Sequence, residues 1–142
     1  MVFISVESGL SLLNGGNMLL IKCVTAYVVV RELMEKEFDY KSAHAILMLS
    51  QKLKPHVDFY GIKERELMEK FAVKDESGRV KLEGNIWQLK DASDADKYRA
   101  EINSLGAVEV NGFEEPIRIS AVPTIKPAHL EALFGFIEFG GE

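Results

Sequence analysis

The chain has 142 residues, of which 47% are hydrophobic and 27% are charged, and its formal net charge is −5. A chain of this length and composition is typical of one globular domain, and it can bury roughly two-thirds of its unfolded surface without a metal or a disulfide. The acidic balance argues against direct nucleic-acid binding, because such domains usually present a basic face. Cys23 is the only cysteine, so an intramolecular disulfide is excluded and a reducing compartment is expected.

The most apolar run is Met18–Val30, which Lys22 interrupts. It is shorter than the roughly 20 residues that a membrane-spanning helix needs. Residues 1–17 have no basic segment ahead of an apolar one, as a secretory signal would. The sequence therefore predicts a cytoplasmic protein without a membrane partner. We expect a single α+β domain over residues 18–142, with residues 1–17 forming an N-terminal extension or an edge strand that docks on it.

A first helix is predicted over residues 18–38. The stretch "RELMEKEF" favours a helix, although the β-branched Val28–Val30 favour a strand, and the length of the segment decides for the helix. Four side chains are spaced to share its buried face: Cys23, Tyr27, Val30 and Met34. The joint to the next element is short, so the two neighbours are expected to be antiparallel.

The second predicted helix begins at Asp39 or Ser42, either of which can cap it, and runs towards Ala72. An apolar stripe at three- and four-residue spacing supports it: Ile46, Leu49, Leu53, Val57, Tyr60, Leu67 and Phe71. Pro55 lacks a backbone donor and crowds the preceding turn. We therefore expect a kink near residues 51–54, or two shorter helices in series.

The second half of the chain has shorter elements. Turn formers at 75–78 and 83–85 predict a β-hairpin or an ordered excursion. A third helix is expected over residues 91–107, capped by Ser93 or Asp94 and ended by Gly106 in a left-handed conformation.

Two half-buried strands, "AVEVN" and "PIRIS", follow across "GFEE", and a helix from Pro127 closes the chain. Four apolar residues of that helix are expected to face inward: Leu130, Leu133, Phe134 and Ile137. The predicted fold is thus α+β, a long antiparallel helical pair packed with a small antiparallel β-sheet and a C-terminal helix.

The hexapeptide "RELMEK" occurs twice, at Arg31–Lys36 and Arg65–Lys70, with starts 34 residues apart. That is the period of a common helical repeat, but a true repeat aligns over its whole length. The 13 residues before the first copy match those before the second at one position only, Leu19 with Leu53. Arg, Glu, Leu, Met and Lys are all good helix formers, so we interpret the copies as the ends of two helices.

No motif in the chain indicates a reaction. His44 and His56 would lie about 18 Å apart along one helix, too far to share a metal, and neither zinc-ligand spacing nor a calcium loop is present. A nucleophile elbow is absent, and "NGGN" is not followed by the residues of a phosphate loop. The paired carboxylates near residue 91 suit a helix N-terminus. We therefore predict no catalytic residue, no metal and no cofactor.

Two features are candidates for binding a partner. Trp87 is the only tryptophan and lies in a loop-rich segment, where it either covers the helical pair or anchors a partner. Lys54, Lys63 and Arg65 make the middle of the second helix locally basic, together with Lys52 and His56. Such a run is usually a solvated face, but an acidic partner can also use it.

Three stretches carry a resemblance to a known group: "KLKPHVDFYGIKERELMEKFAVKDESGRV", "ADKYRAEINSLGAVEVNG" and "IKPAHLEALFGFIEF". They resemble small, uncharacterised proteins of tailed bacteriophages and prophages over roughly residues 41–138. In such proteins a long helix ends in an Arg-Glu-Leu-x-Glu-Lys-Phe/Tyr-type segment, followed by an Asp-Glu-x-Gly turn and an E-x-N-x-L helix. This chain departs from them in its first 17 residues and in "VKLEGNIWQLK". The resemblance implies a viral origin and brings no catalytic residues with it.

Our leading hypothesis is a non-enzymatic, phage-like protein that binds another protein, in virion assembly or structure. A second hypothesis is a phage-encoded inhibitor of a host defence nuclease, anti-CRISPR-like, whose acidic surface mimics nucleic acid. A third, a small metal-dependent enzyme, rests only on scattered carboxylates and on His44, His56 and His129. A homo-oligomer is also expected, because the apolar positions on the first two helices exceed what one narrow seam would bury.

Overall fold

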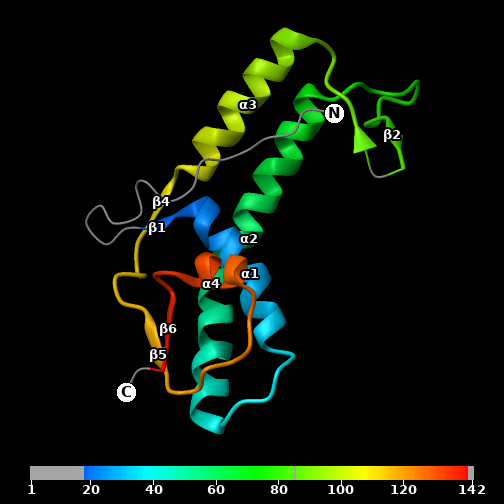
Figure 1. The fold of residues 1–142 in the computed structure, drawn as a ribbon. Helices are drawn as coiled ribbons and strands as arrows, with labels where there is room; N and C mark the ends of the chain where they lie inside the picture. Colours follow the sequence, from blue (N-terminus) through cyan, green and yellow to red (C-terminus); the bar gives the residue numbers. More distant parts are fainter. Residues whose placement is uncertain (1–17, 85, 141–142) are drawn as a thin grey trace.

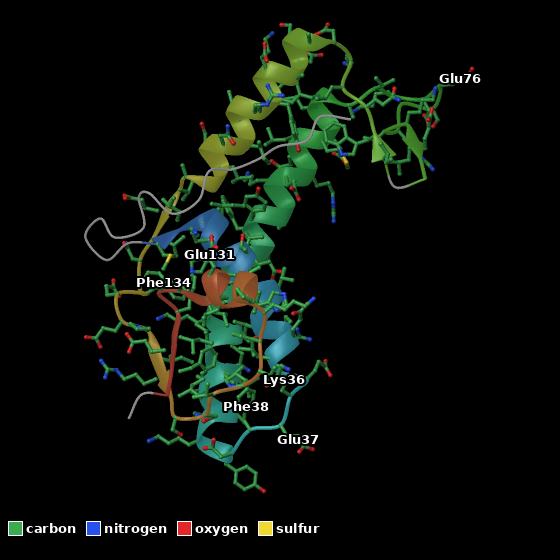
Figure 2. The ribbon with its side chains drawn as sticks, in the orientation of Figure 1. Lys36, Glu37, Phe38, Glu76, Glu131 and Phe134 are labelled. Atoms are coloured by element: carbon green, nitrogen blue, oxygen red, sulfur yellow. The ribbon has the colours of Figure 1, made fainter. Side chains whose placement is uncertain are left out.

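An antiparallel helical pair forms the centre of the fold in the computed structural model, which describes residues 18–84 and 86–140 (Figure 1). α1 (Leu20–Leu33) and α2 (Tyr40–Phe71) are joined by a short connection that contains Lys36, Glu37 and Phe38 (Figure 2). Asp39 caps α2, because its side chain accepts a hydrogen bond of 3.2 Å from the backbone N–H of Ser42. The predicted pair and the first of the two predicted caps are confirmed.

α2 is one continuous helix of 32 residues, so the expectation of two helices in series is wrong. Pro55 cannot bond the carbonyl of Gln51, four residues earlier. Both residues are exposed, so water can satisfy that carbonyl while the apolar stripe on the opposite side of the helix stays intact. A proline on the solvent side is therefore tolerated inside this helix.

The core lies between α1, α2 and the segments that cover them. α1 contributes Leu20, Cys23, Ala26, Val29, Val30 and Leu33, and α2 contributes Ile46, Leu49, Leu53, Tyr60 and Phe71. The predicted stripe on α2 is thus largely confirmed, with Val57 and Leu67 half-buried. Cys23 is fully buried, and this burial raises the pKa of its thiol to about 12.

α3 (Ala92–Gly106) packs on α2 and on α1. Its cap is Asp91, whose side chain accepts a hydrogen bond of 2.8 Å from the backbone N–H of Asp94, so the predicted caps Ser93 and Asp94 are wrong by two or three residues. Gly106 is not left-handed either. It is buried, and a Cβ there would lie 3.1 Å from the Cβ of Ile21. The glycine therefore allows α3 to approach α1 closely.

In residues 18–84 and 86–140, the strands form three separate two-stranded ladders rather than one sheet. β1 (Met18–Leu19) pairs antiparallel with β4 (Glu109–Val110), and β2 (Leu82–Glu83) pairs with β3 (Ile86–Trp87) in the predicted hairpin. β5 (Ile117–Ile119) pairs in parallel with β6 (Ile137–Phe139).

The two strands predicted across "GFEE" correspond to β4 and β5, and they pair with other strands instead of with each other. A parallel pair needs a crossover connection, and α4 (Pro127–Leu133) lies in the segment that joins β5 to β6. Two of the described ladders are therefore antiparallel, as predicted for the small sheet, and the ladder of β5 and β6 is parallel.

α4 begins at Pro127 as predicted, but it is shorter than expected, because Gly135 with φ 88° turns the chain into β6. Leu133 and Ile137 are buried, Ile137 as a strand residue. Leu130 and Phe134 are 52% and 60% exposed, so the expectation that they face inward is wrong. Figure 2 labels Glu131 in α4 and Phe134 directly after it.

We predict that Leu53→Ala lowers the free energy of unfolding by about 2–5 kcal/mol, because Leu53 is fully buried and its truncation leaves a cavity. The same substitution at the exposed Leu130 should cost less than about 1 kcal/mol. Urea unfolding followed by circular dichroism measures both. Equal losses in the two variants would contradict this assignment of the core.

Candidate functional site

An open groove with a volume of about 580 Å³ lies along the first half of α2. Its apolar lining comes from two sides: Ala45, Met48 and Leu49 of α2, and Phe113, Ile117 and Phe136 from the second half of the chain. Figure 1 shows β5 and β6 beside this half of α2. The groove therefore forms only when segments that are distant in the sequence pack together.

Phe113 forms the wall opposite α2. The preceding Gly112 has φ 99°, a conformation that favours glycine, and this turn directs the chain back onto the helix. The ring of Phe113 packs edge-on against Phe136, with centroids 5.4 Å apart, and against His56 at 5.9 Å. The wall is thus fixed on both sides by aromatic contacts.

Glu114 stabilises the same turn. The backbone N–H of Gly112 donates to its carboxylate at 3.1 Å. Hydrogen bonds from the backbone N–H groups of Glu114 itself and of Gly112 lower the pKa of this carboxyl, so its charged form is favoured. The glutamate therefore acts on the shape of the groove rather than on a ligand.

Polar side chains form the rim of the groove. The Nζ of Lys52 lies 4.5 Å from the ring centroid of Phe113 and donates a hydrogen bond to the carbonyl of Gly112. His44 and Glu115 also line the groove. An apolar floor with a few polar groups at its edge suits binding of an apolar side chain that the rim orients.

The structure does not gather the predicted basic residues into one site. Lys54 forms an exposed ion pair with Asp58 at 2.8 Å, and Lys63 forms one with Glu66 at 3.3 Å. At 100° per residue, Lys54 and Arg65 fall on one side of α2, and Lys63 falls on the opposite side. Of the basic residues on this helix, Lys52 lines the groove, whereas Lys54, Lys63 and Arg65 do not.

Trp87 lies away from the groove, in the hairpin beyond α2. It is half-buried, and its ring packs edge-on against Tyr98 of α3 at 5.2 Å; Tyr98 in turn packs against Phe71 at 6.1 Å. This packing supports the interpretation that Trp87 covers the helices. A role of Trp87 in binding a partner stays a prediction.

Glu64 lies beside this aromatic cluster. Although the residue is exposed on the surface, neighbouring side chains partly desolvate its carboxyl and raise its pKa. Burial and the nearby Glu64 charge raise the pKa of Tyr60 to about 12, and the same two causes raise the pKa of Tyr98. α2 and α3 therefore pack around one carboxyl whose charged form is less favourable than that of a fully solvated glutamate.

The three histidines lie in separate places. His44 is exposed at the groove, His56 packs on Phe113, and the Nδ1 of His129 in α4 lies 3.3 Å from the Oε2 of Glu32 in α1. In residues 18–84 and 86–140, no three His, Cys, Asp or Glu side chains gather in a way that could hold a metal ion. No helix of this part of the chain is long and apolar enough to cross a membrane.

Comparison with known proteins gives no relative: no protein-family model, no curated protein and no solved structure matches this chain.

We predict that Glu64→Gln makes the protein more stable than the wild type near pH 7. Since the folded state raises the pKa of Glu64, the stability that its proton contributes is fully present below the unfolded pKa of about 4.3 and is lost as the pH rises through the folded pKa. The variant should therefore match the wild type near pH 4 and exceed it near pH 7. Urea unfolding at both pH values measures this difference.

Glu69→Gln is the matched control, because Glu69 is an exposed glutamate on the same helix. It should follow the wild type at both pH values. A Glu64→Gln variant whose stability difference from the wild type does not change with pH would contradict the assigned desolvation.

Proposed function

We propose that this protein is a non-enzymatic, phage-like binding protein whose groove between α2 and Phe113 holds a segment of another protein. The apolar lining of that groove carries the proposal. A cleft that exposes Met48 to 50% and keeps Lys52 over an aromatic wall gains free energy when an apolar side chain displaces water from it.

The groove also has features that select its ligand. Lys52 and Glu115 place opposite charges at its rim, so a segment with an apolar anchor flanked by polar residues of both signs fits best. Met48 has a flexible thioether that can adapt to the shape of the anchor. These features match recognition of a short protein segment better than chemistry on a small molecule.

The partner class follows from the resemblance to proteins of tailed phages, which favours a virion protein and a role in assembly. The alternative, an inhibitor of a host defence nuclease, draws on the segment 91–118. In this segment acidic residues outnumber basic ones by seven to three. The acidic residues are Asp91, Asp94, Asp96, Glu101, Glu109, Glu114 and Glu115, and the basic ones are Lys97, Arg99 and Arg118. That segment supplies the negative charge that a nucleic-acid mimic needs.

We predict that Ala45→Arg weakens binding of the partner at least about tenfold, a loss of about 1.4 kcal/mol, because the arginine would fill the groove that Ala45 lines. Ala43→Arg is the matched control: it adds the same side chain to an exposed position about 160° around the same helix. The partner is captured from a lysate of phage-infected bacteria, identified by mass spectrometry, purified and titrated by calorimetry.

The other candidate residues are tested in the same titration. Arg65→Glu and Trp87→Phe should bind as the wild type does, since both residues lie outside the groove. Loss of binding in either variant while Ala45→Arg binds normally would contradict the groove as the site. Capture of a nuclease instead of a virion protein would favour the alternative function.

A further inference from the structure

The outward side of α2 has an apolar stripe that lies outside the core and overlaps the groove at Met48 and Gln51. Met48, Phe59 and Ile62 are 50%, 46% and 56% exposed, and Gln51 and Pro55 between them are exposed as well. At 100° per residue these five side chains fall within about 80° of one another, opposite the buried Leu53 stripe. Their spacing of three, four, four and three residues is the pattern of a helix that pairs with another helix.

We propose that this outer stripe pairs with the same stripe of a second copy of the chain, as an antiparallel α2–α2 contact about a two-fold axis at Pro55. In a two-fold interface, each contact between two positions occurs twice. With the axis at Pro55, Met48 lies opposite Ile62 of the second copy, and Gln51 lies opposite Phe59 of the second copy. The stripe is thus complementary to itself at Met48 and Ile62, which form the apolar contacts on either side of Pro55, while the amide of Gln51 lies against the ring of Phe59.

The charges beyond the stripe favour the antiparallel direction. The same register places His44 opposite Glu66 of the second copy and Lys41 opposite Glu69 of the second copy. A parallel pair would instead set Lys41, Glu66 and Glu69 each against the same residue of the second copy, and such like-charge contacts are destabilising. Glu66 already contacts Lys63 at 3.3 Å, but its side chain remains 58% exposed, so its carboxylate can also accept a hydrogen bond from the His44 ring of the second copy.

The length of the stripe indicates a modest affinity. Met48 and Ile62 are about 21 Å apart along the helix axis. A single helix face of this length buries less surface than the about 800 Å² per partner of a standard interface. We therefore expect a dissociation constant in the micromolar range. Met48 and Gln51 line both the stripe and the groove, whereas Pro55, Phe59 and Ile62 belong to the stripe alone. The two proposals are still tested separately, because Ala45 lies about 80° from the centre of the stripe and Ile62 does not line the groove.

Disulfide cross-linking tests the register. Pro55→Cys should form a covalent dimer under mild oxidation, because position 55 meets itself on the axis, and loss of the proline favours the helix. Met48→Cys alone should not cross-link, whereas a mixture of Met48→Cys and Ile62→Cys chains should form the heterodimer. The native Cys23 is buried and gives no background. Equal cross-linking of Met48→Cys and Pro55→Cys would overturn the antiparallel register.

Sedimentation equilibrium tests the contact itself. The wild type should be dimeric at about 100 µM, and Ile62→Glu should raise the dissociation constant at least about tenfold. Leu82→Glu is the matched control, since Leu82 in the hairpin is 58% exposed and lies outside the stripe. A wild type that is monomeric at about 100 µM, or a dimer that Leu82→Glu dissociates and Ile62→Glu does not, would overturn the proposal.

Discussion

Burial of the apolar stripe on α2 is the constraint on which the rest of the structure depends. α2 is about 48 Å long and α1 only about 21 Å, so α1 can cover no more than part of the stripe. α3 packs on α2 as well, and Phe71, Tyr98 and Trp87 form the aromatic contacts at that end. The second half of the chain therefore covers the part of the α2 stripe that α1 does not reach.

The same constraint produces the groove. After α3 the chain must return past α1, and Gly106 permits the close approach to Ile21 that lets it do so. Gly112 then turns the chain so that Phe113 meets α2 beside Lys52. This loop contacts α2 at Lys52 and His56, and the apolar groove lies beside these contacts. The candidate site is thus a consequence of how the loop covers the helix.

Local patterns predicted the helices and turns well, because helical periodicity and turn residues act within a few positions. They failed where distant contacts decide: the partners of β4 and β5, the reason for Gly106, and the exposure of Phe134. The groove could not be predicted for the same reason, since nothing in the sequence indicates that Phe113 and Phe136 line it together with Lys52. The two "RELMEK" copies illustrate this limit, because Leu33 in the first is fully buried whereas Leu67 in the second is only half-buried.

The outer side of α2 is the part of the helix that folding does not explain. Single exposed apolar residues are common on protein surfaces and need no cause. Met48, Phe59 and Ile62, however, are aligned on one helix opposite its buried stripe, where polar residues would serve the fold equally well and cost less exposed apolar area. In an acidic chain with 27% charged residues, an aligned apolar stripe with Lys41 before it and Glu66 and Glu69 after it is what supports the proposed association. α2 therefore joins three surfaces, a core face, a groove wall and an outer stripe. The groove wall shares Leu49 with the core, whereas Met48, Phe59 and Ile62 of the outer stripe lie outside it.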